Sequence, residues 1–170
     1  MTASDGALLA SLLAEEDRLV FSYFDHDTAW ELGSLLRTEA MGAHLSVAIE
    51  IRRAGQCLFH AALPGSSADN DAWLLRKAAV AERYGHSSYY IGCRFRADGK
   101  DFDADSRLDS SVFAAHGGAF PIILEKSGCI GTVTVSGLPQ VEDHRFVVTH
   151  LEHFLTDRKQ IATGERPAPA

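Results

Sequence analysis

The spacing of apolar residues changes several times along the chain, and each change marks the start of a new predicted element. Leucines at helical spacing predict a helix over residues 6–16, and the apolar run 20–24 predicts a short strand. Residues 25–42 predict a second helix, because apolar side chains recur every three or four positions between an aspartate cap and Gly42.

Four later segments alternate between apolar and polar residues, as strands with one buried face do. They are residues 45–52, 57–63, 119–125 and 129–136. Short turns join them in pairs, so the sequence predicts two antiparallel hairpins. Cys57, Phe59, Ala61 and Leu63 are expected on one face of the second strand. Pro121 favours an edge or ladder-free position, because proline has no N–H to donate.

Helical spacing returns in the segments between and after the hairpins. Helices are predicted at 69–84, 87–96, 108–115 and about 137–159. Residues 87–96 satisfy both periods, and we favour a helix there. The polar segment 97–105 is expected to be a surface loop. These elements predict an α+β single domain over residues 1–159, with a central antiparallel sheet of about five strands flanked by helices. Residues 160–170 are predicted to be a disordered tail.

Composition narrows the class of protein. With 170 residues, 46% of them hydrophobic and 23% charged, the chain is long enough and apolar enough for one folded core. The net charge of −7, with no basic stripe, disfavours nucleic-acid binding. No apolar run could span a membrane, and the N-terminus does not resemble a secretory signal. The three cysteines form no C-x-x-C pair and are expected mainly in the core, so we predict a cytoplasmic location.

Glycine-marked turns are the first candidates for chemistry. His116-Gly117-Gly118 could form a nest of backbone N–H groups that receives an anion, or it could simply be a tight loop. Ser136-Gly137 lies at a strand-to-helix junction, where a helix N-terminus offers free N–H groups and partial positive charge. Pro139 removes one of those donors, so a plain helix start remains an alternative.

A second candidate lies on one face of the helix at 69–84. Asp69, Trp73, Arg76 and Lys77 recur at three- and four-residue steps, with Asn70 beside them. A tryptophan flanked by two cations could hold a flat anionic ligand. The alternative is a core tryptophan beside solvated charges.

Histidine and cysteine chemistry has weaker support. Asp143 and His144 could act as an acid–base pair, but neighbours on a helix point about 100° apart. His150 and His153 lack a third ligand in a metal-binding frame, so we predict no metal site. The sequence contains no G-x-S-x-G, G-K-[ST] or G-x-G-x-x-G motif, which removes the usual support for a hydrolase or a nucleotide cradle.

Several motifs together resemble the haem-degrading-domain superfamily, which includes GlcG- and HbpS-like proteins. They are H-G-G-A-F-P-I at 116–122, G-x-x-x-V-S-G-L at 131–138, and Gln140 followed by Asp143-His144. L-F-H-A-A-L-P-G at 58–65, D-N-D-A-W-L-L-R-K at 69–77 and the Ser87-Ser88 pair make the chain more similar to the superfamily's branch of uncharacterised proteins. The resemblance spans residues 24–155 and implies a profilin-like fold and homo-oligomers.

Members of the superfamily are associated with haem or small organic acids, so the resemblance implies a small-ligand site, with haem as a candidate cofactor. We expect the motif residues to converge on one ligand, a tetrapyrrole or a small organic anion. They are Asp69, Asn70, Trp73, Arg76, Lys77, His116, Gly117, Gly118, Pro121, Ser136, Gly137, Gln140 and Asp143. An enzyme that uses His116 or His144 as acid or base, and an oligomeric adaptor without a pocket, are the alternatives.

Overall fold

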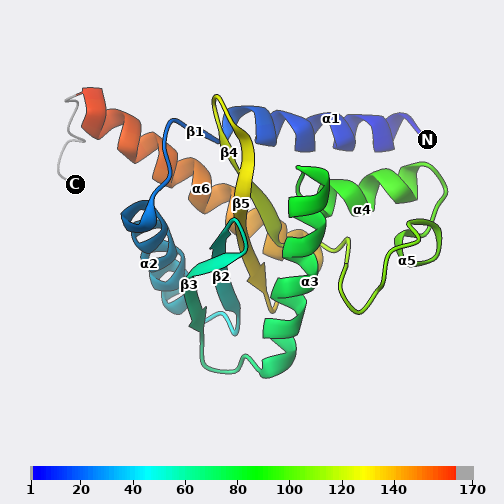
Figure 1. The fold of residues 1–170 in the computed structure, drawn as a ribbon, viewed down its shortest axis with the longest axis horizontal. Helices are drawn as coiled ribbons and strands as arrows, with labels where there is room; N and C mark the ends of the chain where they lie inside the picture. Colours follow the sequence, from blue (N-terminus) through cyan, green and yellow to red (C-terminus); the bar gives the residue numbers. More distant parts are fainter. Residues whose placement is uncertain (1, 164–170) are drawn as a thin grey trace.

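The computed structural model of the protein describes residues 2–163. Within this range, helices and strands follow one another in the order shown in Figure 1. They are α1 (Ala3–Arg18), β1 (Val20–Phe21), α2 (His26–Gly42), β2 (Ala48–Arg53), β3 (Gln56–Ala62), α3 (Ala68–Tyr84), α4 (Ser88–Ala97), α5 (Phe102–Asp105), β4 (Ala119–Leu124), β5 (Gly128–Ser136) and α6 (Gln140–Thr163).

The five strands form one sheet in the order β1-β4-β5-β2-β3. Both predicted hairpins are present, and β2 also pairs with β5 in antiparallel register. The sheet is nevertheless mixed and not wholly antiparallel, because β1 runs parallel to β4. β1 pairs with Ile123 and Leu124 of β4, so within residues 2–163 no strand pairs with β4 on that side at Pro121. The missing N–H of Pro121 therefore costs the sheet no hydrogen bond there.

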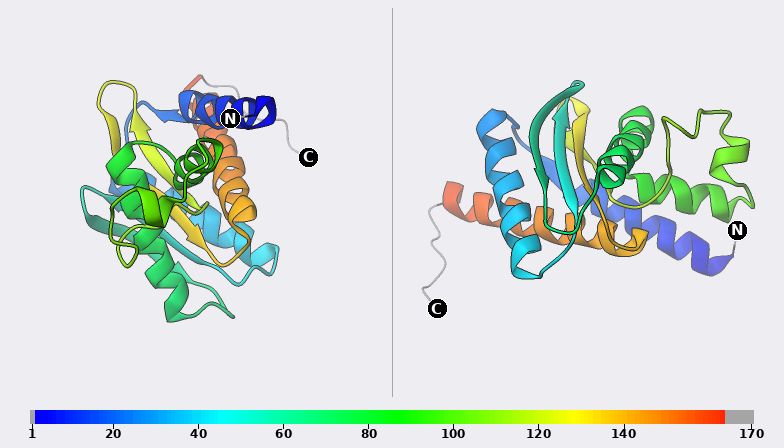
Figure 2. Two further views of the ribbon diagram at one scale, coloured as in Figure 1. Left: turned by 90° about the vertical axis from the view of Figure 1, so that its right-hand side faces the viewer. Right: turned by 90° about the horizontal axis from the view of Figure 1, so that it is seen from below.

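Helices cover both faces of the sheet. In the right-hand view of Figure 2, α2 lies on one side of the strands and α3 on the other. The main core is formed by α2, α6 and the sheet, around buried residues such as Leu32, Ile49, Phe120 and Leu151. A second cluster lies between α1, α3 and α4, around Leu12, Val80 and Ile91. The α+β domain predicted from the hydrophobic pattern is confirmed.

Helix α3 packs against one face of β2 and buries a polar residue on that face. The alternating pattern of β2 predicted one polar, solvated face, but Glu50 on that face is only 6% exposed. The carboxylate pairs with Arg52 at 3.1 Å, while Oε1 has no hydrogen-bond partner among the described residues. A sequence pattern reports the polarity of a face, whereas burial depends on which helix packs against it.

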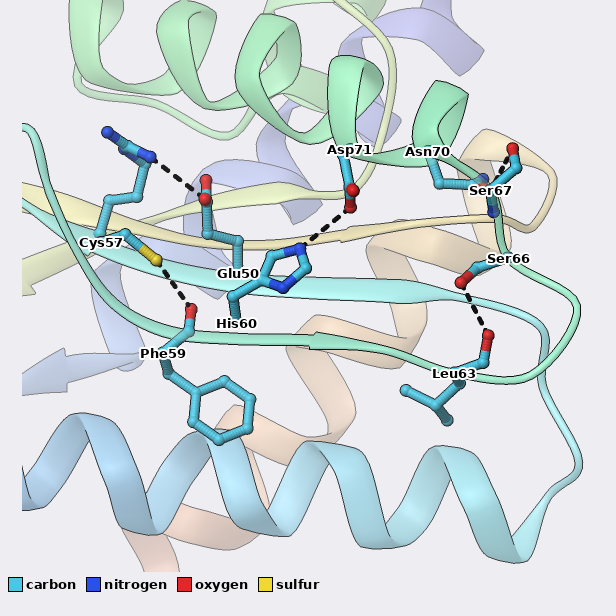
Figure 3. Close-up of polar contacts among 10 residues, drawn as sticks. Glu50, Cys57, Phe59, His60, Leu63, Ser66, Ser67, Asn70 and Asp71 are labelled. Carbon is cyan, nitrogen blue, oxygen red and sulfur yellow. Dashed lines mark hydrogen bonds and ion pairs between the residues drawn. The ribbon is translucent and has the colours of Figure 1, made fainter.

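A β-bulge changes the direction of Cys57. The β2–β3 register shifts between Ile51 and Arg52, so Phe59 lies opposite Ile51 but Cys57 lies opposite Arg52. Cys57 therefore faces the α3 side with Glu50 and His60, whereas Phe59 points to α2 (Figure 3). The prediction of a shared face for Cys57 and Phe59 was wrong, because strict alternation cannot anticipate an extra residue. Cys57 is also exposed and not in the core.

Several predicted boundaries also differ. The ambiguous segment 87–96 is a helix, α4, as favoured, but the predicted loop 97–105 contains the short helix α5. Residues 108–115 are not helical, because Asp109 accepts the N–H of Ser111 in a local turn and Ala114 donates to the carbonyl of Arg76. α6 continues to Thr163, beyond its predicted end at 159. The remainder of the predicted disordered tail, residues 164–170, lies outside the described residues.

Candidate functional site

A pocket of about 270 Å³ lies between the first turns of α3 and α6 at the end of β5. Nearly all of its lining residues come from the motifs identified in the sequence. They are Asp69, Asn70, Trp73, Lys77, His116, Ser136, Gly137, Leu138, Gln140 and Asp143. The separate motifs therefore meet at one small concavity.

Local backbone geometry creates this concavity. β5 ends at Ser136, and Gly137 turns the chain into α6 with φ of 152°. A Cβ at Gly137 would lie 2.4 Å from the carbonyl oxygen of Ser46, so no larger residue fits this turn without displacing the backbone. α3 begins on the other side, after Ser67. Two helix N-termini thus border the pocket, and both contribute partial positive charge.

The floor of the pocket is a buried ion pair between α3 and α6. Lys77 Nζ donates to Asp143 Oδ2 at 2.8 Å and to the carbonyl oxygen of Val135 at 3.2 Å. The other carboxylate oxygen of Asp143 accepts the N–H of Leu138 at 3.1 Å. The Lys77 and Asp143 side chains are only 5% and 1% exposed. Lys77 therefore joins α3 to β5 and to the first turns of α6.

Burial moves the pKa values of these two groups towards each other. Loss of water lowers the pKa of Lys77, and this effect exceeds the opposing attraction to Asp143. Loss of water likewise raises the pKa of Asp143 against the attraction to Lys77. Both shifts reduce the free-energy difference between the ionised pair and the neutral pair. The preference of the proton for the Lys77 amine over the Asp143 carboxylate is therefore weaker than it would be in water.

The two glycines after His116 provide space for this floor and do not line the pocket. A Cβ at Gly118 would lie 2.3 Å from the oxygen of Val135 and 2.9 Å from Lys77 Nζ, and its φ is 130°. A Cβ at Gly117 would lie 2.0 Å from the oxygen of Gln140. The predicted backbone nest is thus a close-packing device between β4 and α6. The N–H of Gly117 donates to Gln140 Oε1 at 3.4 Å and is not directed at a ligand.

Hydrogen-bond acceptors around the pocket are largely occupied by the protein. Asn70 Oδ1 accepts the N–H of Ser67 at 2.8 Å (Figure 3), and Gln140 Oε1 accepts from Gly117. Both oxygens of Asp143 are also used. These contacts leave the amide NH₂ groups of Asn70 and Gln140, together with the Ser136 hydroxyl, available on the lining. Apart from the Asp69 carboxylate, the side chains that line the pocket therefore present mainly donors.

Trp73 is only partly available to a ligand. The Arg76 guanidinium lies over its ring, 3.9 Å from the centroid, and the His116 ring meets it edge to face at 5.2 Å. Arg76 does not line the pocket. In this structure the Arg76 guanidinium lies over the indole itself, which differs from the arrangement in which Arg76 and Lys77 flank a ligand on Trp73. Pro121, buried in β4 opposite Thr132, is not among the residues that line the pocket either.

The two histidines proposed as acid or base lie in different places. His116 borders the pocket, and partial burial lowers its pKa. His144 is buried on the other side of α6, where Nε2 lies 2.8 Å from Glu15 Oε2 and the ring packs against Tyr89. Asp143 and His144 thus diverge as helical neighbours should. Of the two alternative acid–base candidates, His116 and His144, only His116 lines the pocket.

A second pocket, of about 670 Å³, lies near the β2–β3 turn and the start of β5, at the opposite end of β5 from Ser136. Its lining includes Phe24, Leu124 and Ile130 together with Arg53, Glu82 and Cys129. Burial raises the pKa of the Cys129 thiol, so this cysteine is a poor nucleophile at neutral pH. Of the motifs that carry the family resemblance, only the first residue of G-x-x-x-V-S-G-L, Gly131, lines this pocket.

Two further findings concern residues 2–163 only. No three His, Cys, Asp or Glu side chains in this range are placed to hold a metal ion together. No helix in this range is both long and apolar enough to cross a membrane.

Known proteins share this architecture and much of this sequence. A family model described as haem degrading protein HbpS-like matches residues 24–152. The chain belongs to this HbpS-like family. A UPF0303 protein of Streptomyces avermitilis is 58% identical, over 87% of this chain and 91% of its own length. The crystal structure of the Ybr137w protein is 36% identical and covers 89% of each chain, with a TM-score of 0.82.

A structure of a PduOC–haem complex also has the HbpS-like fold. It is 18% identical, with a TM-score of 0.62, and covers 78% of this chain and 94% of that chain. At this identity the likeness concerns the fold alone.

In this HbpS-like chain, two contributors to the site escaped sequence reasoning. Leu138 lines the pocket although it was noted only as part of a motif. The Ser88 hydroxyl, on α4, donates to the carbonyl of His116 at 2.5 Å and accepts the N–H of Ala119 at 3.1 Å. Ser88 thereby fixes the loop that carries His116. Its distance of 28 residues along the chain leaves no local pattern from which this contact could be predicted.

Proposed function

We propose that the HbpS-like chain binds a small organic anion, with one carboxylate, in the pocket between α3 and α6. The observation that carries this proposal is the imbalance of hydrogen-bonding groups on the lining. Within residues 2–163 the acceptors of Asn70, Gln140 and Asp143 are already paired, whereas amide and hydroxyl donors and one N–H of Lys77 are left. The Asp69 carboxylate at the rim is the exception. An anion accepts hydrogen bonds, so it satisfies such a lining better than a neutral or cationic ligand does.

Charge around the pocket favours a monoanion over a dianion. Lys77 and the two helix N-termini attract negative charge, while Asp143 already neutralises part of that attraction. Asp69 lines the rim and would repel a second anionic group placed near it. A ligand with one carboxylate and a short neutral or hydroxylated remainder suits both conditions.

The family description and the PduOC complex both name haem. This pocket is too small for a complete haem molecule. A volume of about 270 Å³ lies just below the roughly 300–1,000 Å³ of typical small-molecule sites. The lining is polar, whereas a porphyrin needs an extended apolar surface. Haem binding and haem degradation therefore have no support from the residues of this pocket.

Thermal-shift and calorimetric titrations test the proposal with acetate, L-lactate, malonate and haem as probes. We expect the monocarboxylates to raise the melting temperature, malonate to do so less, and Gln140→Ala to weaken binding of the monocarboxylates. Gly6→Ala is the control, since a Cβ at this position in α1 meets no atom within 4 Å, and its binding should equal that of the native chain. Binding of haem with a Soret shift, without binding of any carboxylate, would overturn the proposal.

We also propose that the chain forms homo-oligomers in the cytoplasm, as the family resemblance suggested. Light scattering on the purified protein gives the oligomeric state directly. A monomer at all concentrations would contradict this proposal without affecting the anion site. A stable protein partner together with no small-molecule binding would instead favour the adaptor alternative.

A further inference from the structure

We propose that Lys77 forms a reversible imine with a 2-oxo carboxylic acid held in this pocket. The proposal rests on the proposed function, because the carboxylate of the ligand must first be bound by the donors of the lining. It adds a covalent step and names the chemical class of the ligand. Four observations support it in turn.

The first observation is the bonding of Lys77 Nζ. The nitrogen has four tetrahedral positions, and the bond to carbon takes one of them. Two others are directed at Val135 O and Asp143 Oδ2. Among the described residues no acceptor takes the remaining position, and Lys77 is one of the residues that line the pocket. In the neutral amine, two N–H groups satisfy both acceptors and the lone pair takes this last position. A neutral Lys77 would therefore present a nucleophile to the pocket without losing either hydrogen bond.

The second observation is the environment that makes a neutral amine accessible. Lys77 is buried, and burial lowers its pKa while it raises that of Asp143. Desolvation is one of the ways by which lysines become nucleophiles towards carbonyl carbons. Arg76 adds a further positive charge on the same helix, which also lowers the pKa of Lys77.

The third observation is that Asp143 can accept and donate the protons that imine formation requires. The lone pair of Nζ attacks the carbonyl carbon, and the carbonyl π electrons move to oxygen. Asp143, 2.8 Å from Nζ, takes one proton from nitrogen and passes it to the oxygen, which gives a carbinolamine. Asp143 then takes the second nitrogen proton and passes it to the hydroxyl, which leaves as water while the C=N bond forms. Amine and ketone thus give imine and water, with no oxidant or reductant consumed.

The fourth observation is the arrangement of the remaining donors. Ser136 and Gln140 line the same pocket as Lys77, and their hydroxyl and amide groups can hold a carboxylate beside the amine. In a 2-oxo acid the carboxylate is bonded directly to the carbonyl carbon, so one small ligand can reach both. The limited volume favours acids with short side chains. Gly118 preserves this arrangement, because a Cβ there would lie 2.9 Å from Nζ.

Borohydride trapping on the native chain tests the proposal, with pyruvate as the probe. Sodium borohydride reduces an imine to a stable secondary amine, which peptide mapping by mass spectrometry assigns to a lysine. We expect the adduct at Lys77 to exceed that at the exposed Lys100 and Lys126 at least tenfold. L-Lactate, which has the same carboxylate but no carbonyl, should reduce labelling at Lys77 by competition. Lys77→Arg keeps the charge and should lose the adduct.

The outcomes separate this proposal from the anion site. Binding of L-lactate and pyruvate without a trapped adduct at Lys77 overturns the imine and leaves the anion site intact. Equal labelling of Lys77, Lys100 and Lys126 also overturns it, because such labelling reflects exposure to reagent only. Absence of any carboxylate binding overturns both. The native chain alone decides among these results, so the test does not depend on the folding of Lys77→Arg.

Discussion

Two acid–base pairs include consecutive residues of α6, Asp143 and His144, but the two pairs lie in different places relative to the pocket. Asp143 pairs with Lys77 on the pocket floor, whereas His144 pairs with Glu15 of α1 on the other side of the helix. Both α6 side chains are almost fully buried. Only the first pair lines a concavity with free donors around it. The comparison shows that burial of an ionisable pair does not by itself mark a functional site.

The second pair belongs to the attachment of α1. The neighbouring Glu16 accepts from the N–H of Ser87 at 2.7 Å and contacts His86 Nδ1 at 2.5 Å. Adjacent carboxylates of α1 therefore hold the helix against two separate parts of the domain, beside the apolar cluster that includes Leu12. We interpret Glu15 and Glu16 as structural, and the predictions below separate their role from that of the pocket floor.

Removal of one partner from the pocket floor should have the largest effect on stability. Asp143→Ala leaves the Lys77 ammonium buried without its counter-ion, and we expect a loss of about 3–5 kcal/mol in the free energy of unfolding. Urea denaturation measures this loss. The double variant Lys77→Met/Asp143→Leu should recover most of the stability but not carboxylate binding, because apolar residues of similar size need no partner. A double variant as unstable as Asp143→Ala would contradict this explanation.

A methyl group at Gly118 should perturb the same floor from the β4 side. The Cβ would contact the oxygen of Val135 and Lys77 Nζ at a positive φ, so we expect Gly118→Ala to cost about 1–3 kcal/mol and to weaken carboxylate binding. Gly128→Ala is the matched control, since Gly128 also has positive φ but open space around it. If both variants bind carboxylates as tightly as the native chain does, Gly118 has no role in positioning Lys77.

The glycines also show how far the sequence could predict the site. The family resemblance implied that the H-G-G, S-G and Asp143 segments meet, and helical spacing placed Asp69, Trp73 and Lys77 on one face of the helix at 69–84. The sequence could not show that Arg76 stacks on Trp73, because stacking depends on side-chain conformation and not on helical phase. Nor could it show that Gly117 and Gly118 make room for α6 and Lys77, because that contact joins segments brought together only by the sheet.

The fold was predictable for a related reason. Buried apolar residues recur every 3.6 positions in a helix and every second position in a strand, and most of the long elements were predicted from these two periods. The bulge at Cys57, the parallel pairing of the two-residue β1 and the non-helical course of residues 113–116 leave little trace in a periodic pattern. Each depends on a partner strand or helix distant in sequence.

Removal of the α1 partner should lower stability without affecting the pocket. Glu15→Ala leaves His144 Nε2 buried and unpaired, beside an Nδ1 that already has no partner among the described residues, so we expect a loss of about 1–2 kcal/mol. Carboxylate affinity should stay unchanged, because neither Glu15 nor His144 lines the pocket. Parallel urea denaturation and calorimetry check both expectations. A clear loss of affinity in Glu15→Ala would show that the two pairs are coupled through α6.

The smallest expected effect is a dependence of stability on pH at the pocket rim. Burial lowers the pKa of His116 below its ordinary value of 6.5, with Lys77, Arg96 and Arg76 acting in the same direction and Asp103 opposing. Between the lowered pKa and 6.5 the unfolded chain binds more protons than the folded chain. Stability from His116 is therefore complete above pH 6.5 and decreases as pH falls through the lowered pKa. His116→Gln should show a shallower loss of stability over this range in urea denaturation at a series of pH values. Identical pH profiles for the two proteins would mean that the rim does not bury His116, and that its ring is as free as a surface histidine to meet a ligand.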